Sequence, residues 1–331
     1  MERSRRSTSA DVARRAGVSR ATVSYVLNGR ADQAIPESTR QRVLAAARDL
    51  SYTPNAAARA LRAGESRLVL LVNEGIPLGP AMSRVVDALT AEVARAGRSL
   101  VLWQSTGPGG LGPALTHLDP CLTITLGSLD DAARALLADA RIPAVDAGLG
   151  GDLDPADGEI PGWLQVDHLA GRGHRHIGVL STGDRVLRRF AEPRVAGARR
   201  AARESGLPEP SVAQVPTGEA LSVGAVETVL ARWRDDPDPV TAVACYNDYV
   251  AAATVAAATR MGLAVPGDLA VVGVDNEQFS RYTSPPLTTV SLDTPAFARE
   301  VWARAQHVLD GLPGEHPHDA PRFSLVLRGS S

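Results

Sequence analysis

The sequence predicts an α/β protein that is preceded by a small helical unit. From residue 68 onward, ten apolar segments of strand length alternate with Ala- and Arg-rich segments of helical length. This alternation is typical of parallel sheets covered by helices. Before residue 68, apolar residues recur at helical spacing in short segments. A chain of 331 residues is long enough for two or three domains.

Charge divides the chain at the same point. Residues 1–67 hold 13 Arg and 6 acidic residues, a balance of +7, and the remainder holds 22 Arg and 31 acidic residues, a balance of −9. Together they give the net charge of −2. A basic head on an acidic body fits one segment that meets phosphate while the rest stays away from it. The alternative interpretation is a solvated charged face.

Two short helices joined by a tight turn are predicted between residues 7 and 28. Gly17 can take the left-handed conformation that ends the first helix, and the hydroxyl of Ser19 can cap the second. Val23 and Val26 recur at helical spacing and face inward. The opposite face exposes Arg20, Ala21, Thr22, Ser24 and Tyr25. This is the arrangement of a helix-turn-helix, whose second helix enters the DNA major groove; an ordinary helical hairpin is the alternative.

Two further helices are predicted before the α/β region. Pro36 starts a third helix, which covers residues 38–50 and closes a small core with its apolar stripe. Pro54 then forbids continuation. Residues 55–64 form a short helix candidate, capped by Asn55, with Leu61 as its one large apolar side chain. Because so short a helix is not stable alone in water, we expect it to fold on binding; a plain linker helix is the alternative.

The α/β region is expected to form two lobes, since ten strands are better split than held in one sheet. The strands are predicted at 68–72, 99–103, 122–126, 144–146, 176–180, 212–215, 242–245, 269–275, 288–291 and 322–327. Helices are predicted at 82–96, 194–205, 222–233, 248–261 and 295–310, and loops at the Pro- and Gly-rich stretches 107–113 and 148–162. Ligands of such folds lie at the carboxyl ends of strands or between lobes.

Composition favours a protein of the cytoplasm. Cys121 and Cys245 each lie in an apolar run and form no paired motif, as buried thiols of a reducing compartment do. The start of the chain has no apolar core of a signal peptide. No apolar run is long enough to span a membrane, so we expect no membrane partner.

Motifs of enzymes and metal sites are weak in this chain. Residues 107–112 match the dinucleotide-binding spacing, but they follow the second strand of the domain, and Pro108 and Pro113 crowd the turn. We interpret the stretch as a flexible loop. His174 and His176 share a face without an evident third ligand, and no nucleophile elbow occurs. We therefore predict no catalytic residues, no cofactor and no metal.

Several motifs resemble those of LacI/GalR bacterial transcription regulators. The headpiece signature of that family is similar to Asp11-Val-Ala-Arg-Arg-Ala-Gly-Val-Ser-Arg-Ala-Thr-Val-Ser followed by Leu27-Asn28, and its hinge helix to Tyr52-x-Pro-Asn-Ala-Ala-Ala-Arg-Ala-Leu61. Further landmarks are Gly173-His-Arg-His-Ile-Gly178, Arg194-Val-Ala-Gly197, Asn247-Asp248, the run from 265 to 275 and Ser284-Pro-Pro-Leu-Thr-Thr-Val290. The resemblance covers nearly the whole chain in the right order.

The resemblance implies a helix-turn-helix headpiece at residues 1–52, a hinge helix and linker at 53–66, and a two-lobed effector-binding and dimerisation domain at 67–331, similar to periplasmic sugar-binding proteins. It implies base reading by Arg20, Ala21 and Tyr25. It also implies contacts with DNA phosphates by Ser19, Thr22, Ser24, Asn28 and Thr39. The hinge residues Asn55, Ala58 and Leu61 would enter the minor groove, where Leu61 wedges open the centre of the operator.

The implied function is a transcription regulator, most often a repressor, that binds palindromic operator DNA as a homodimer under the control of a small-molecule effector. Arg194, Asn247 and Asp275 match positions that face the effector, and a cation, an amide and a carboxylate suit a sugar or another hydroxyl-rich ligand. A structural ion pair or helix cap is the alternative for each. The first-lobe loop at 72–80 and the short segment at 162–173 depart from the family pattern, and the aromatic often found near 219–221 is absent.

A second class of function fits the same α/β pattern. It is a two-lobed solute-binding protein or an enzyme without a DNA role, and it predicts ligand binding or activity that survives deletion of residues 1–64.

Overall fold

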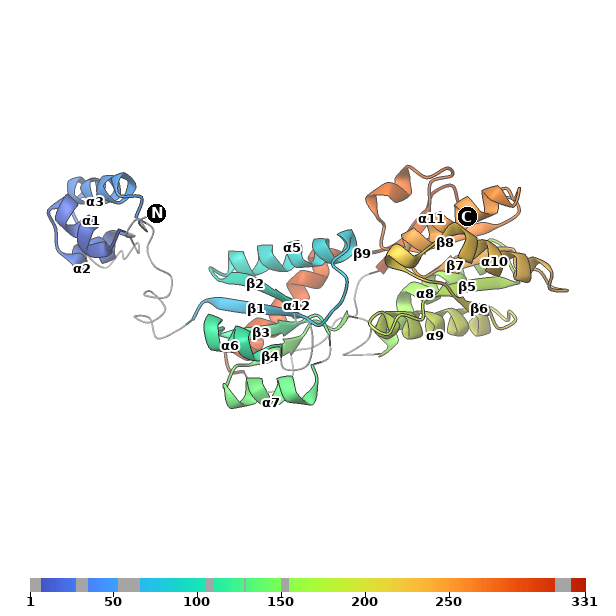
Figure 1. Ribbon diagram of the computed structural model, residues 1–331, viewed down its shortest axis with the longest axis horizontal. Coiled ribbons are helices and arrows are strands. Elements are labelled where there is room, and N and C mark those ends of the chain that lie inside the picture. The colour runs from blue at the N-terminus through green and yellow to red at the C-terminus, as the bar shows by residue number, and fades with distance from the viewer. Residues whose placement is uncertain are drawn as a thin grey trace. The chain divides into compact units, whose positions relative to one another are not determined.

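The computed structural model describes residues 7–27, 35–52, 66–104, 110–127, 129–149, 155–312 and 323–331. The chain forms two compact units, Met1–Ser66 and Arg67–Ser331 (Figure 1). The predicted hinge helix, with Asn55, Ala58 and Leu61, lies outside the described residues, as does Asn28. The boundary between headpiece and hinge therefore stays a prediction.

The first unit contains three helices, α1 (Ser9–Ala16), α2 (Arg20–Leu27) and α3 (Glu37–Asp49). The structure starts α1 with a capping box: the Thr8 hydroxyl accepts from the Asp11 backbone N–H, and the Asp11 carboxylate accepts from the Thr8 backbone N–H at 2.9 Å. Gly17 ends α1 with φ of 66°, in the left-handed region, as predicted. The helices enclose a core of buried Val and Ala side chains: Val12, Ala13, Ala16, Val23, Val26, Val43, Ala46 and Ala47.

The first lobe of the second unit is a parallel sheet with strand order β2-β1-β3-β4. Its strands are β1 (Leu68–Asn73), β2 (Ser99–Gln104), β3 (Leu122–Thr125) and β4 (Ala144–Asp146). Val69 and Leu71 face the helices α5 (Pro80–Arg95) and α12 (Thr294–Leu309). Leu70 and Val72 face α6 (Gly112–Leu118) and α7 (Asp131–Asp139) on the other side. Burial on both faces explains the nearly continuous apolar sequence of β1.

The second lobe is a larger sheet with order β10-β9-β8-β7-β5-β6, in which only β10 of the described strands is antiparallel to its neighbour. The strands are β5 (Ile177–Ser181), β6 (Ser211–Gln214), β7 (Ala242–Cys245), β8 (Ala270–Val274), β9 (Thr288–Leu292) and β10 (Phe323–Val326). Helices α8 (Pro155–Gly171) and α9 (Arg188–Glu204) cover one face, and α10 (Val223–Arg234) and α11 (Asp248–Arg260) cover the other.

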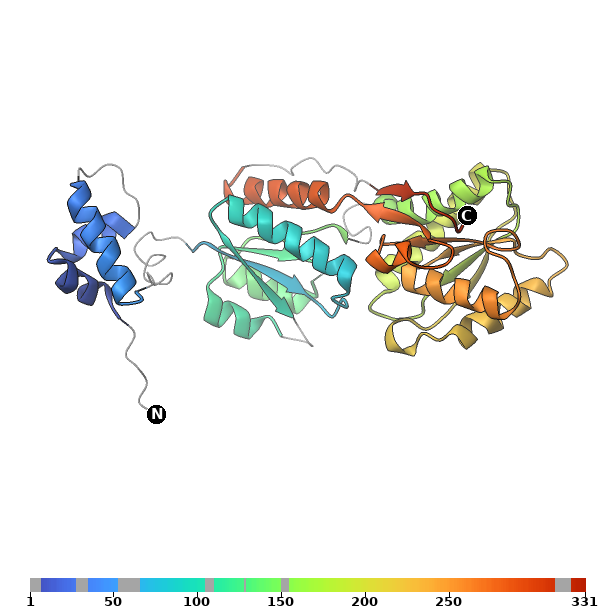
Figure 2. The same cartoon turned by 90° about the horizontal axis from the view of Figure 1, so that it is seen from above.

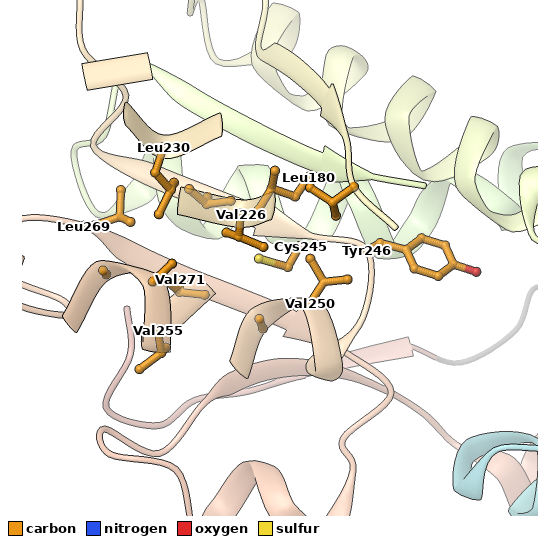
Figure 3. Close-up of a cluster of buried hydrophobic side chains, with 14 of the residues drawn as sticks. Leu180, Val226, Leu230, Cys245, Tyr246, Val250, Val255, Leu269 and Val271 are labelled. Atoms are coloured by element: carbon orange, nitrogen blue, oxygen red, sulfur yellow. The ribbon is translucent and has the colours of Figure 1, made fainter. Parts of the chain in front are cut away.

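The core under α10 and α11 holds Leu180, Val226, Leu230, Val250 and Leu269 (Figure 3). In the same view the ring of Tyr246 extends out of this cluster from the end of β7. Tyr246 thus lies at the edge of the core, at the carboxyl end of a central strand, which is where α/β folds place their ligands.

The chain crosses between the lobes after β4, after β9 and before β10. Figure 2 shows α12 beside α5, although α12 follows a strand of the other lobe. Phe297 and Val301 of α12 pack into the core of the first lobe with Leu89 of α5. Two lobes joined by several crossing segments can move relative to each other only by bending these segments together.

All ten predicted strands occur, each within two residues of its expected bounds. The loop predicted at 148–162 is wrong in its second half, because α8 begins at Pro155, a residue that suits the first turn of a helix since it needs no backbone N–H there. Likewise α6 begins at Gly112 inside the predicted loop at 107–113. Helix α9 starts at Arg188, six residues before its predicted start, and continues through Pro193.

Helices α8 and α9 approach each other closely because two glycines face the opposite backbone. A Cβ atom on Gly162 would lie 1.8 Å from the carbonyl oxygen of Arg194, and one on Gly197 would lie 2.0 Å from that of Glu159. Neither backbone can yield without moving its helix. The contact therefore fixes the position of Arg194, which carries one of the predicted effector-binding side chains.

We predict that Gly162→Ala destabilises the second unit by about 1–3 kcal/mol, since the added methyl group overpacks this contact. Gly171→Ala at the end of the same helix is the matched control, because nothing lies within 4 Å of its Cβ position and alanine is the better helix former. Thermal unfolding of both variants measures the difference. Equal midpoints for the two variants would contradict the close contact.

Candidate functional site

The second helix of the first unit presents the predicted DNA-reading face. Arg20 and Ala21 are exposed and Tyr25 is half-buried, while Val23 and Val26 are buried beneath them. The predicted cap is confirmed, because the Ser19 hydroxyl accepts from the Thr22 backbone N–H at 3.0 Å. α2 is therefore held at its first turn with its polar face outward.

The predicted phosphate contacts lie around this face. The hydroxyls of Ser19 and Thr22 lie 2.9 Å apart and share a hydrogen bond. Ser24 is half-buried on α2, and Thr39 on α3 accepts from Arg42 at 3.4 Å. These side chains keep polar atoms at the surface of the headpiece, and their contact with phosphate stays a prediction.

A cavity of about 120 Å³ lies between the two lobes of the second unit. Arg194 from α9 and Asp275 from the end of β8 both line it, as do Met82 and Val85 of α5 and Phe297 of α12. Asn247 is not among the described residues that line it. Its side chain instead caps α11 by accepting from the Val250 backbone N–H at 3.0 Å. The structure thus brings two of the three predicted effector residues together.

The guanidinium of Arg194 is held at the wall of this cavity. It donates to the carbonyl oxygen of Tyr246 at 2.5 Å and lies 4.8 Å over the ring of that residue. Burial raises the pKa of the Tyr246 hydroxyl to about 12, although the nearby Arg194 charge lowers it. The other terminal nitrogen of Arg194 lies 3.8 Å from the carboxylate of Asp275. That distance is longer than a hydrogen bond.

Asp275 belongs to a loop with an unusual backbone. Asp275 has φ of 99° and Asn276 has φ of 47°, both in the left-handed region that costs free energy for residues other than glycine. The backbone N–H of Asp275 donates to the Val290 carbonyl at 2.8 Å, and the Asn276 side chain accepts from Arg328 at 2.6 Å. Burial raises the pKa of the Asp275 carboxyl, while Arg194 and Arg84 lower it.

The buried carboxylate of Asp248 anchors the end of this loop. It accepts from the Glu277 backbone N–H at 2.7 Å and from the Thr289 hydroxyl at 2.6 Å. Gly273 leaves room for it, since a Cβ there would lie 2.1 Å from Asp248 Oδ1. Burial raises the pKa of Asp248 to about 7, the two hydrogen bonds oppose the shift, and the charges of Asp275 and Glu277 add to it.

Glu277 extends from the same loop to the other lobe. Its carboxylate accepts from the Ala81 backbone N–H at 3.0 Å and lies 3.5 Å from a terminal nitrogen of Arg84. Arg84 also donates to the carbonyl oxygen of Asp275 at 2.5 Å. A carboxylate is favourable at the start of α5, where Gly79 supplies no capping side chain. We call the contacts of Arg84 and Glu277 the interlobe bridge.

A second contact between the lobes involves Arg189 of α9. Gly127, which follows β3, lies so close that its Cβ would be 1.7 Å from Arg189 Nη1. Glu74 at the end of β1 has a raised pKa, caused first by burial and then by Asp130, and the charge of Arg189 lowers it. The absence of a side chain at position 127 therefore makes room for a cation that spans the lobes.

Glu277, Arg84 and Arg189 of this region match no motif in the sequence. Their sequence signal is weak: Glu277 follows a buried strand in the run Asp275-Asn-Glu277, where polar residues end up at the carboxyl edge of a sheet. The partners of Glu277 lie more than 190 positions away in sequence. Only the folded chain brings them together.

The histidine and cysteine side chains singled out in the sequence make contacts within the described part of the fold or are buried in it. His174 shares a hydrogen bond of 3.0 Å with Thr241, and His176 lies 3.9 Å from Asp238. No group of described His, Cys, Asp and Glu residues could hold a metal ion. The Cys245 thiol is buried, which raises its pKa to about 12. No helix among the described residues is long and apolar enough to cross a membrane.

We predict that Asp248→Asn removes a pH dependence of stability. Because the folded pKa of Asp248 is about 7 and its usual value is 3.8, the folded protein holds a proton that the unfolded chain releases between these values. The proton on Asp248 stabilises the folded state at low pH. Its contribution to the free energy of unfolding, on the order of 4 kcal/mol, is lost as the pH rises toward 7.

Thermal midpoints of the second unit, measured from pH 4 to 8, should therefore fall more for the native chain than for Asp248→Asn. The control is Asp167→Asn on the exposed face of α8. Parallel curves for the native chain and Asp248→Asn would show that Asp248 is charged throughout this range.

We also predict that Glu277→Gln opens the interlobe bridge. The neutral amide loses the ion pair with Arg84 and binds the helix terminus more weakly. Amide hydrogen exchange in the first turn of α5 should rise several-fold in the full chain. Glu92→Gln is the matched control, since Glu92 pairs with Arg95 within the same helix. Equal exchange in both variants would contradict the bridge.

Both units of the chain are similar to known protein domains. Residues 8–55 match the model of bacterial regulatory proteins of the lacI family, and residues 166–331 match a periplasmic binding protein-like domain. The HTH-type transcriptional repressor PurR of Vibrio cholerae is 31% identical over 85% of this chain and 84% of its own length. The HTH-type transcriptional regulator GalR of Escherichia coli is 31% identical over 92% of this chain and 89% of its own.

Among solved structures, the Lac repressor dimer bound to operator and the anti-inducer ONPF has a TM-score of 0.78 at 26% identity and covers 98% of this chain and 99% of that one. These relatives are transcriptional regulators and not enzymes. With its helix-turn-helix unit and its two-lobed α/β domain, the chain belongs to the lacI family of bacterial regulatory proteins.

Proposed function

We propose that this chain is a repressor that binds a palindromic operator as a homodimer and whose DNA affinity is controlled by a sugar-like effector. The observation that carries the DNA role is the capped helix α2, which exposes Arg20 and Ala21 over a buried Val23 and Val26. The basic balance of residues 1–67 supports it. An operator-binding protein of this kind acts in the cytoplasm.

In this proposal α2 reads bases in the major groove. The guanidinium of Arg20 forks onto a guanine edge, the methyl group of Ala21 touches a thymine methyl, and Tyr25 reaches a base or a phosphate. Ser19, Thr22, Ser24, Asn28 and Thr39 hold phosphates and set the register. Asn55, Ala58 and Leu61 enter the minor groove, with Leu61 as the wedge.

The homodimer supplies the second half of the reader. A short hinge helix that is unstable alone needs both DNA and a partner subunit to fold. The Lac repressor, to which the chain is similar, is a dimer on its operator.

The effector binds in the cavity between the lobes, where Arg194 and Asp275 line the wall. The transcriptional regulator CelR, a structural relative with a TM-score of 0.66 at 25% identity, is solved as its cellobiose complex. Asn247 contributes by fixing the start of α11. An effector that changes the relation of the lobes changes the separation of the hinges and so the affinity for DNA.

The test is a gel shift on palindromic sites next to the gene of this protein, at several salt concentrations. We expect selective, salt-sensitive binding by the full chain. Arg20→Ala should relax base choice at one position in each half-site by about 1–3 kcal/mol, whereas Arg232→Ala, an exposed residue of α10, should change nothing. A uniform loss over all sequences would make Arg20 a phosphate contact, and no selective binding would refute the DNA role.

A further inference from the structure

Each lobe of the second unit extends an arginine to the other lobe. Arg84 of α5, in the first lobe, donates to the carbonyl oxygen of Asp275 and lies 3.5 Å from the carboxylate of Glu277. Arg189 of α9, in the second lobe, lies so close to Gly127 of the first lobe that a Cβ atom there would be 1.7 Å from Nη1. The two contacts are made by different segments of the chain, so they are independent observations of the same kind of contact.

Each of these arginines acts on a half-buried carboxyl group of the opposite lobe. Burial raises the pKa of Asp275, while Arg194 and then Arg84 lower it. Burial also raises the pKa of Glu74, which directly follows β1, and the charge of Arg189 lowers it. Because a nearby cation favours the charged form of a carboxyl group, each contact between the lobes favours a deprotonated carboxylate on the lobe that the arginine reaches.

The other charged and titratable groups around these carboxyls belong to the same lobe as the carboxyl that they face. Around Asp275 and its loop they are Arg194, Tyr246, Asp248, Tyr249, Glu277 and Arg328, and around Glu74 they are Asp130 and Arg134. These groups stay beside the carboxyls whether the lobes touch or separate. Arg84 and Arg189 do not, so the pKa of each carboxyl is lower when the lobes are in contact than when they are apart.

Asp248 brings this titration close to neutral pH. Its carboxyl lies under the 275–277 loop, where it accepts from the Glu277 backbone N–H and from the Thr289 hydroxyl. Burial raises the pKa of Asp248 to about 7, the two hydrogen bonds lower it, and the charges of Asp275 and Glu277 raise it. The carboxyls of Asp248, Asp275 and Glu277 therefore titrate as one cluster, and Arg84 contacts that cluster from the other lobe.

We propose that contact between the two lobes is coupled to the release of protons, so that a fall in pH favours separated lobes. Protons leave the carboxyl cluster and Glu74 when Arg84 and Arg189 arrive, and by reciprocity added protons disfavour the contacts of both arginines. This linkage is a property of the second unit. Its effect on operator affinity rests on the proposed function, in which the relation of the lobes controls DNA binding.

The experiment is hydrogen exchange of the full chain between pH 6 and 8, without a ligand, resolved to the amide of Ala81 by mass spectrometry with fragmentation. Pro80 has no N–H, so Ala81 is the first amide of α5, and its hydrogen bond to Glu277 is lost when the lobes separate. After correction for the intrinsic exchange rate, we expect protection of Ala81 to rise several-fold over this range, up to the ~tenfold of a one-unit difference in pKa. Constant or falling protection overturns the proposal.

Arg84→Met and Arg189→Met each remove one of the crossing cations. Each should lower the protection of Ala81 and reduce its pH dependence, and the double variant should lose that dependence. Arg189→Met is the stricter test, because Arg189 belongs to the other contact and reaches Ala81 only through the relation of the lobes. Arg95→Met is the matched control, since Arg95 pairs with Glu92 within α5, and it should keep the native curve. A pH dependence as large as the native one in either crossing-cation variant overturns the inference.

Asp248→Asn removes the group that titrates near neutral pH, so it should also reduce the pH dependence of Ala81 protection. A native curve in a folded Asp248→Asn chain contradicts the inference, and if that variant does not fold, the two arginine variants decide. A gel shift on the same preparations at one pH separates the two proposals. Operator binding with protection that does not depend on pH refutes the proton linkage alone, and pH-dependent protection without operator binding refutes the DNA role alone.

Discussion

The arrangement of the second unit depends on the two hydrogen bonds that the buried carboxylate of Asp248 accepts. One comes from the Glu277 backbone and the other from Thr289 on β9, so Asp248 holds the 275–277 loop against the sheet. The loop needs this support because two successive residues have left-handed backbones. Its conformation sends the Asp275 side chain toward the cavity and the Glu277 side chain to the first lobe. One anchoring group thus supports both the side chain that faces the cavity and the side chain that contacts the other lobe.

The same loop contributes both to the wall of the cavity and to the contact between the lobes. α5 starts with a glycine cap, so its N-terminal turn takes its partner from the opposite lobe, and that partner is Glu277. Met82 and Val85 of α5 line the cavity together with Arg84, so this helix presents both apolar side chains and a guanidinium that also pairs with Glu277. The close packing of α8 on α9 at Gly162 and Gly197 then fixes Arg194 on the facing wall. Contacts that hold the lobes together therefore also determine which chemical groups remain for a ligand.

Local sequence patterns were sufficient for most of the fold and for part of the site. Strands that are buried on both faces, such as β1, β7 and β8, have nearly continuous apolar sequences, and these are the strands that the pattern predicts most directly. Gly17 and Ser19 identified the turn of the first unit because each acts on its own neighbours. The pattern failed at 148–162, where Pro and Gly suggested a loop and Pro155 in fact opens a helix. Asn247 was expected in the cavity and caps α11. Glu277 and Arg84 could not be inferred, because their contact is made across the fold and leaves no spacing in the sequence.

The interlobe bridge has a consequence for how size and response are related in a ligand. The lobes are joined by groups of the chain itself, so the joined form does not depend on a ligand to exist. A molecule that fits within the present cavity adds contacts to the joined form and shifts the population toward it. A larger molecule that displaces Arg84, which lines the cavity and pairs with Glu277, would shift the population the other way. Two ligands that carry the same hydroxyl groups but differ in size would then have opposite effects. The smaller would favour the joined form of the lobes, and the larger would disfavour it.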